Sequence, residues 1–183
     1  ESAVLAGGGL IRKYPGRALL VTTGACAVHC RYCFRRHTDY GKVGMGRQLD
    51  LALQTLQEDT SLREVILSGG DPLSLSEPRL IELIESLSGL GHLQSLRLHS
   101  RSAIATPHRL SSALIRTLGY SRLRVVMVVH VNHAREIGPE ACEALLALKD
   151  AGVTLLNQSV LLRGVNDSAQ AQIDLSEKLS TAG

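Results

Sequence analysis

The chain has 183 residues, of which 44% are apolar and 20% charged, a composition typical of a folded globular domain that excludes a disordered chain. Its net charge of +3 comes from acidic and basic residues that are interspersed, so we expect no nucleic-acid partner. No apolar run approaches the roughly 20 residues that a membrane helix needs, and no secretory signal is present, which predicts a cytoplasmic protein without a membrane contact.

Apolar, β-branched segments alternate with amphipathic segments along the chain. The predicted strands are Ala18–Thr22, Glu64–Leu67, Leu96–His99, Arg124–His130 and Val153–Asn157, and the predicted helices lie near residues 48–59, 78–88, 110–119, 139–150 and 168–180. The last four strands start at residues 64, 96, 124 and 153, spacings that match the length of a βαβ unit. The pattern therefore predicts a parallel α/β fold.

Polar residues follow each of the predicted strands, and they help to choose between an open doubly wound sheet and a barrel. They are a cysteine-rich segment after the first strand and then Ser68–Asp71, His99–Arg101, His130–His133 and Asn157–Ser159. In a barrel all these strand ends meet at one mouth, whereas an open sheet focuses only the strands at its switch point. We therefore expect a partial parallel (βα) barrel with about five βα units.

Three of the four cysteines, Cys26, Cys30 and Cys33, have the spacing C-x3-C-x2-C. A disulfide framework is disfavoured because there is no secretory context and three cysteines cannot all pair. Structural zinc would need a fourth ligand, which His29 or His37 can supply. Three thiolates can also hold an iron-sulfur cluster and leave one iron open. The spacing alone does not decide between zinc and iron-sulfur.

The basic residues around this segment suit a small anionic ligand; they are Arg31, Arg35, Arg36 and His37.

The C-x3-C-x2-C segment, with Tyr32 just before its last cysteine and a strand just before its first, resembles the signature of radical S-adenosylmethionine (SAM) enzymes. The resemblance implies that Cys26, Cys30 and Cys33 hold a 4Fe-4S cluster whose open iron binds SAM. It also implies that an electron from the cluster cleaves SAM and yields a 5′-deoxyadenosyl radical, because removing an unactivated C–H hydrogen needs a radical that no side chain supplies.

Within that superfamily the chain resembles the lysine 2,3-aminomutase family, and most closely its branch that acts in β-lysylation of elongation factor P (EF-P). The matching segments are Lys13 to Leu20, Cys26 to His37, Leu67 to Leu73, Leu98 to Arg101, His130 to His133 and Gly152 to Asp167. The resemblance implies an isomerase that converts L-α-lysine to (R)-β-lysine with pyridoxal 5′-phosphate (PLP) as a further cofactor. It also implies free lysine as substrate, an electron donor such as flavodoxin or ferredoxin, and a functional link to EF-P.

Further site residues follow from the same resemblance. Gly69, Gly70 and Asp71 match a SAM-binding turn, where glycines allow close backbone approach and a carboxylate can accept from the SAM ammonium. The other SAM-contacting positions are Tyr32, expected at the adenine, and His130 and Gln158.

The substrate and PLP sites are implied less completely. Arg35 matches the position that pairs with the substrate carboxylate, which suits a planar guanidinium. The residues matched to the PLP phosphate are Lys13, Tyr14 and Arg17. The fourth cysteine, Cys142, lies on an apolar helix face and is expected in the core.

One departure from the family is clear, because no lysine here corresponds to the one that binds PLP. We therefore expect residues 1–183 to be one radical SAM core domain from a longer chain, without the C-terminal segment that carries this lysine. A catabolic lysine or glutamate 2,3-aminomutase is the alternative within the family, and a non-catalytic zinc-binding module is a remote one. The sequence does not fix the oligomeric state, and a homo-oligomer is compatible with it.

Overall fold

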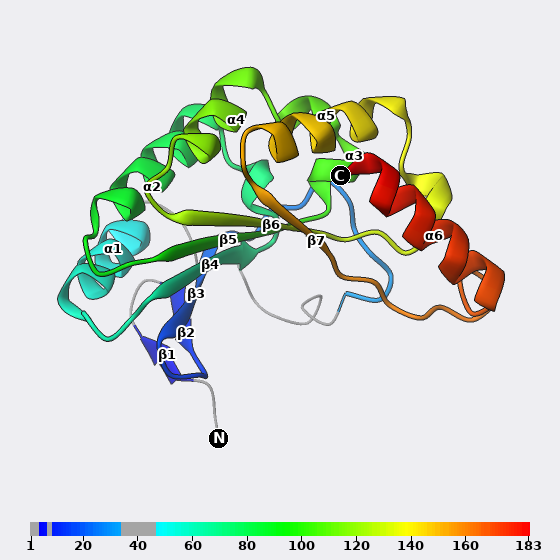
Figure 1. Cartoon of the computed structure of the whole chain (residues 1–183). Coiled ribbons are helices and arrows are strands. Elements are labelled where there is room, and N and C mark those ends of the chain that lie inside the picture. The colour runs from blue at the N-terminus through cyan, green and yellow to red at the C-terminus, as the bar shows by residue number, and fades with distance from the viewer. Residues whose placement is uncertain (1–3, 7–8, 34–46) are drawn as a thin grey trace.

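The computed structural model describes residues 4–6, 9–33 and 47–183, and Figure 1 shows their arrangement. The strands are β1 (Val4–Ala6), β2 (Leu10–Arg12), β3 (Arg17–Thr23), β4 (Glu64–Gly69), β5 (Ser95–Ser100), β6 (Arg124–Val129) and β7 (Thr154–Asn157). The helices are α1 (Arg47–Glu58), α2 (Glu77–Gly89), α3 (Ser102–Ala105), α4 (Ser112–Gly119), α5 (Pro139–Asp150) and α6 (Ala169–Ala182). No helix in these ranges is long and apolar enough to cross a membrane.

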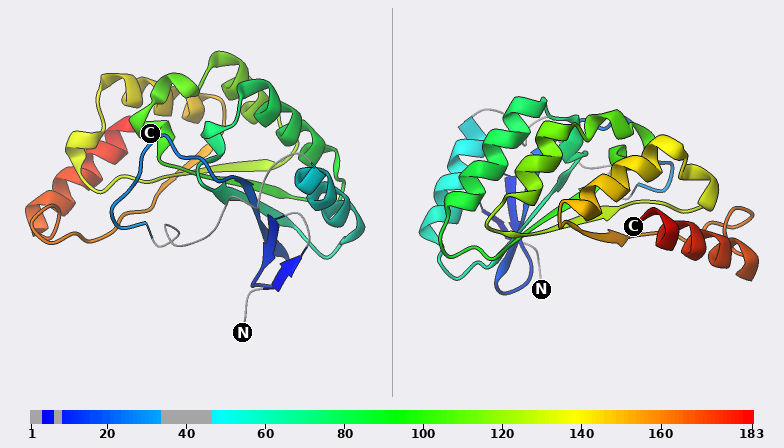
Figure 2. Two further views of the ribbon diagram at one scale, coloured as in Figure 1. Left: turned by 180° about the vertical axis from the view of Figure 1, so that it is seen from behind. Right: turned by 45° about the horizontal axis from the view of Figure 1, so that its top comes forward.

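The seven strands form one sheet in the order β1 to β7, so each strand pairs with its neighbours in sequence. The strands β3 to β7 are all parallel, and helices α1, α2, α4 and α5 lie along one face of the sheet (Figures 1 and 2). A doubly wound sheet reverses its strand order and has helices on both faces. The sequential order instead confirms the predicted partial barrel, which stays open because β1 and β7 are not paired with each other.

The five predicted strands and five predicted helices are all present, with ends that differ by a few residues. The hairpin of β1 and β2, which continues antiparallel onto β3, was not predicted. Each of these two strands has three residues, too few for an apolar alternation to be recognised.

The hydrophobic core lies between the sheet and its helices. Alternate residues of the central strands, such as Val65, Leu67 and Leu98, are fully buried there. They meet helix residues at spacings of three and four, for example Leu80, Leu83, Ile84 and Leu87 of α2. The intervening strand residues, Ile66, Arg97 and His99 among them, are only partly buried and face the other, concave side of the sheet.

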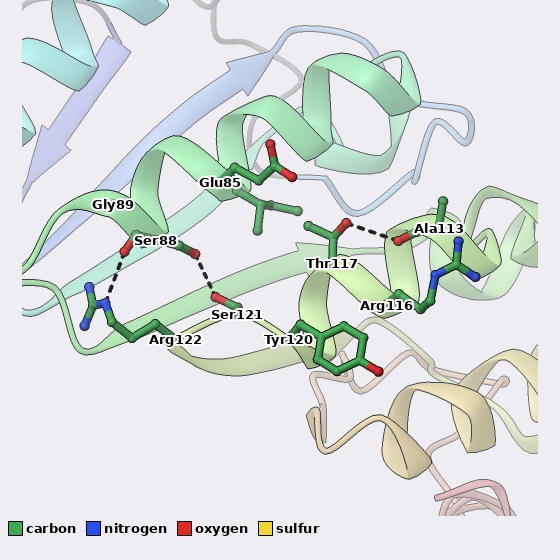
Figure 3. Close-up of a pocket in the computed structure, with 10 residues that line it drawn as sticks. Glu85, Ser88, Gly89, Ala113, Arg116, Thr117, Tyr120, Ser121 and Arg122 are labelled. Atoms are coloured by element: carbon green, nitrogen blue, oxygen red, sulfur yellow. Dashed lines mark hydrogen bonds between the residues drawn. The ribbon is translucent and has the colours of Figure 1, made fainter.

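A surface groove of about 660 Å³ lies on the helical side, between α2 and α4 (Figure 3). Hydrogen bonds connect lining residues on its two sides. The hydroxyls of Ser88 and Ser121 lie 2.8 Å apart, and Arg122 donates to the Ser88 carbonyl at 3.1 Å. The groove is at the end of the helices where the chain enters β5 and β6. It is therefore at the opposite end of the sheet from the carboxyl ends of the strands.

Candidate functional site

The predicted cysteine cluster lies in the loop after β3, here called the Cys loop (residues 24–33). Cys26, Cys30 and Cys33 form no disulfide and are partly buried. The N–H of Cys33 donates to the carbonyl of Cys30 at 3.0 Å, so these two cysteines flank a tight turn. The fourth cysteine, Cys142, packs against the hydrophobic core as predicted and is partly buried.

The start of the Cys loop is joined to the turn after β4 through the backbone of Gly70 and Asp71. Gly70 N–H donates to the Thr23 carbonyl at 2.7 Å, and Asp71 N–H donates to the Ala25 carbonyl at 2.9 Å. Gly69 has φ +115°, and a Cβ there would lie 2.8 Å from the Thr23 oxygen. The space that these glycines leave is therefore filled by the chain itself. Contact of Gly69 and Gly70 with SAM stays a prediction.

The Asp71 carboxylate is held by the protein itself. It is 4% exposed and accepts four hydrogen bonds. The donors are Leu73 N–H and the Ser100 hydroxyl at one oxygen, at 3.0 and 2.8 Å, and Arg101 N–H and Ser102 N–H at the other, both at 2.8 Å. Two carboxylate oxygens offer about four acceptor positions, and these bonds use all of them. Asp71 thereby fastens the β4 turn to the end of β5; its contact with the SAM ammonium stays a prediction.

Arg101 follows β5 and reaches across the strand ends. Its guanidinium donates to the Tyr32 hydroxyl and the His130 carbonyl, each at 2.8 Å, and pairs with Glu136 at 2.5 Å. Asn132 Nδ2 donates to the same Tyr32 oxygen at 2.6 Å. Burial raises the pKa of Tyr32 above its ordinary value, and this effect outweighs the lowering by Asn132 and Arg101. Tyr32 is therefore held by its hydroxyl at the meeting point of three loops.

His130 and Gln158, both predicted to contact SAM, lie at the ends of β6 and β7. His130 Nε2 is 3.4 Å from His99 Nδ1, and the two rings meet edge to face with centroids 5.6 Å apart. The N–H of Gln158 donates to the Val129 carbonyl at 2.9 Å, and its side chain is exposed. The structure thus brings both residues to the end of the sheet that carries the Cys loop.

The predicted PLP residues lie at the other end of β3. Arg17 begins this strand and pairs with Glu64 at 3.6 Å, while the Lys13 ammonium lies 5.3 Å from the centre of the Tyr14 ring. Seven residues of extended strand cover roughly 20 Å, so these side chains and the Cys loop are separated by the length of the sheet. Arg35, matched to the substrate carboxylate, lies outside the described residues, as does His37.

Sequence reasoning did not assign roles to several polar residues that organise this end of the sheet. Asn166 is completely buried and donates to the carbonyls of Asn132 and Val160 at 2.8 and 3.0 Å. Glu136 accepts from the N–H groups of Asn132 and His133 at 2.9 and 3.0 Å. The clustering of polar residues after successive strands was the signal that these residues share with the predicted ones.

In the part of the chain that the structure describes, no three Cys, His, Asp or Glu side chains lie close enough together to hold one metal ion. The donor set nevertheless suits an iron-sulfur cluster, because three thiols without disulfide partners lie within eight residues at the mouth of the sheet. Binding a cluster would require the Cys loop to bring its sulfur atoms together.

A sequence profile of the radical SAM superfamily matches residues 20–174 of this chain. The chain belongs to the radical SAM superfamily. Membership confirms the resemblance drawn from the cysteine spacing and implies a 4Fe-4S cluster and SAM as cofactors. A solved structure with a similar fold is the apo form of the cobalamin-dependent radical SAM enzyme OxsB, with a TM-score of 0.53 over 90% of this chain and 26% of that one. At 15% sequence identity this likeness shows the fold alone.

This radical SAM protein is also similar to curated L-lysine 2,3-aminomutases. It is 46% identical to the one from Escherichia coli over 96% of this chain and 52% of that protein. The relatives from Buchnera aphidicola and Clostridium subterminale are 45% and 38% identical over 93% of the chain, and the match covers 51% and 41% of those proteins. The chain spans about half the length of the curated relatives it matches.

Proposed function

We propose that this radical SAM protein provides the SAM-cleaving core of a PLP-dependent L-lysine 2,3-aminomutase, an isomerase that converts L-α-lysine to (R)-β-lysine for the modification of EF-P. The observation that carries the proposal is the 46% identity to the L-lysine 2,3-aminomutase of Escherichia coli over nearly the whole chain. The order of the strand-end loops supports it, because the Cys loop and the predicted SAM residues lie at the same end of the sheet.

Each group of residues has a part in this proposal. Cys26, Cys30 and Cys33 hold the cluster, and the backbone of Gly69 and Gly70 with His130 and Gln158 surrounds SAM. Tyr32 lies in the Cys loop beside them. Arg35 binds the substrate carboxylate through its planar guanidinium.

The PLP phosphate belongs, in this proposal, at the far end of β3 beside Lys13, Tyr14 and Arg17. Cationic and hydroxyl side chains suit a phosphate, and half of the Arg17 side chain is exposed (51%) despite its pairing with Glu64. PLP and lysine together would then extend along the concave face of the sheet toward the Cys loop. That face carries Ile66, Arg97 and His99, which are partly buried and border the path.

When bound, the cluster supplies the electron that cleaves SAM, and PLP spreads the unpaired electron of the rearranging substrate over its π-system. The amino group moves from C2 to C3 of lysine while one hydrogen moves from C3 to C2, so the reaction is balanced as an isomerisation. The protein contributes binding and orientation: its residues hold SAM and substrate in contact and exclude competing reactions. The electron comes from a donor such as flavodoxin or ferredoxin, and we place the protein in the cytoplasm.

The experiment combines cofactor and turnover measurements on the full-length protein, which must also carry the PLP-binding lysine. After anaerobic reconstitution with iron and sulfide, we expect the brown absorption of a 4Fe-4S cluster, and β-lysine after incubation with lysine, SAM, PLP and a reductant. Cys30→Ala is the control without cluster. A colourless zinc protein would overturn the radical SAM assignment, and a cluster-loaded protein that makes no β-lysine would overturn the aminomutase.

A parallel incubation with glutamate separates the second candidate within the family. Formation of β-glutamate without β-lysine would identify a glutamate 2,3-aminomutase. Formation of β-lysine in a cell extract that does not transfer it to EF-P would favour a catabolic lysine 2,3-aminomutase.

A further inference from the structure

The Tyr32 hydroxyl joins the Cys loop to the ends of two other strands. We propose that Tyr32 is a positioning residue for the cluster site: its hydroxyl fastens the Cys loop to Arg101 after β5 and Asn132 after β6, and so fixes where the loop holds Cys30 and Cys33. This inference rests on the cluster chemistry of the proposed function and is independent of which substrate the protein takes.

The first step is the hydrogen-bond count at the phenol oxygen. Arg101 Nη1 and Asn132 Nδ2 both donate to it, at 2.8 and 2.6 Å. A tyrosine hydroxyl has two acceptor positions and one donor hydrogen. The two donors fill both acceptor positions, so both contacts depend on this one hydroxyl.

The second step is the place of Tyr32 in the Cys loop. It lies two residues after Cys30 and directly before Cys33. The N–H of Cys33 donates to the Cys30 carbonyl at 3.0 Å, so Tyr32 is part of the tight turn that carries these two cysteines. The contacts of its hydroxyl therefore fix the position of this turn.

The third step is that both anchors of Tyr32 are themselves fixed. The N–H of Arg101 donates to the buried Asp71 carboxylate at 2.8 Å, and its guanidinium also bonds Glu136 and the His130 carbonyl. Asn132 Oδ1 accepts from Val160 N–H at 2.8 Å. Arg101 and Asn132 thus connect the loops at the ends of β4, β5, β6 and β7. Through its hydroxyl, Tyr32 fixes the position of the Cys loop relative to these four loops.

The arrangement predicts two effects of removing only the hydroxyl. The Cys loop loses two bonds across the strand ends and opens more readily. Because Cys30 and Cys33 are then held in a wider range of positions, the EPR lines of the reduced cluster become broader. A tyrosine that merely fills space would show neither effect on replacement by phenylalanine.

The test compares Tyr32→Phe with Tyr120→Phe, since Tyr120 is 88% exposed and lies outside the site. Hydrogen exchange of a peptide covering residues 24–33 is measured in the cluster-free protein, and the EPR spectrum of the reduced cluster in the reconstituted protein. We expect exchange in Tyr32→Phe to be faster by about fivefold or more, because a typical hydrogen bond changes a local equilibrium by that factor, and the EPR lines to be broader. Tyr120→Phe should match the unchanged protein in both measurements.

A second variant covers the case in which Tyr32→Phe does not fold. Asn132→Ala removes one of the two donors to the Tyr32 hydroxyl, so exchange of residues 24–33 should again be faster. The proposal is overturned if the folded variant shows the exchange and the EPR spectrum of the unchanged protein. If these two effects are found but the unchanged, cluster-loaded protein forms no β-lysine, the proposed aminomutase is overturned and the role of Tyr32 stands.

Discussion

Gly70 lies directly against the carbonyl oxygen of Ala25, so close that a Cβ on Gly70 would come within 2.1 Å of that oxygen. The N–H groups of Gly70 and Asp71 bond the carbonyls of Thr23 and Ala25 on either side of this contact. The start of the Cys loop and the turn after β4 therefore form one packed unit. The position of the first predicted cluster ligand, Cys26, depends on a glycine that lies more than forty residues away in the sequence.

Replacing Gly70 by alanine should push the start of the Cys loop and the turn after β4 apart. The nearest atoms are backbone atoms that cannot rotate away, so we expect the free energy of unfolding to fall by about 1–3 kcal/mol or more, and the iron content after reconstitution to fall with it. Gly89→Ala is the matched control, since nothing lies within 4 Å of a Cβ there. Urea unfolding and iron analysis measure both effects. Equal unfolding free energies for the two variants would contradict the packing.

Much of the fold could be predicted from the sequence because its signals are local. Apolar alternation marked β4 to β6, and proline marked the first turn of helices such as α5. The order of polar loops after successive strands led to the partial barrel. The short hairpin of β1 and β2 was missed because its strands pair over two or three residues each.

The sequence predicted which residues belong to the candidate site, but not which hydrogen bonds join them. The cysteines and Tyr32 follow from a spacing, whereas the partners of Tyr32, Arg101 and Asn132, lie 69 and 100 residues further along the chain. Asp71 was expected to face a ligand, but three of its donors come from Ser100 to Ser102. Such contacts depend on strand register, which no local pattern in the sequence defines.

The four hydrogen bonds of Asp71 predict a large effect of a small change. In Asp71→Asn an NH2 group replaces one of the two oxygens. This group cannot accept hydrogen bonds, so it faces two donors that lose their acceptor. Losing bonds to a buried charge and leaving donors unpaired should cost about 2–4 kcal/mol of unfolding free energy. Asp150→Asn, at an exposed position at the end of α5, should change it by less than about 0.5 kcal/mol. Denaturant unfolding of both variants gives the comparison, and a cost below about 1 kcal/mol for Asp71→Asn would count against the network.

The division of the cysteines into three ligands and one core residue predicts the iron content of four single variants. Replacing Cys26, Cys30 or Cys33 by alanine should abolish the cluster absorption, since three thiolates are needed. Cys142→Ala should keep about four iron atoms per chain, because Cys142 packs against the core in α5. Iron and sulfide analysis after anaerobic reconstitution measures this. A cluster retained in Cys30→Ala, or lost in Cys142→Ala, would show that the ligand set is wrong.

Asp59, which follows α1, predicts a pH dependence of stability. Its pKa is lowered chiefly by the Ser61 hydroxyl, which donates to Oδ1 at 2.5 Å, and further by the Ser61 N–H and by Arg12. A carboxyl whose folded pKa lies below its unfolded pKa adds stability above the unfolded value, near 4, and that stability is lost as the pH falls through the folded value. Ser61→Ala removes the largest cause, so its unfolding free energy should lie below that of the unchanged protein at pH 6, and the gap should close as the pH falls through the folded pKa of Asp59.

Ser86→Ala, which removes a hydroxyl that bonds the Glu82 carbonyl within α2, is the control, because its difference from the unchanged protein should stay constant over the same pH range. Urea unfolding at several pH values measures these gaps, and a Ser61→Ala gap that does not change with pH would mean that the bond to Asp59 does not favour its charged form.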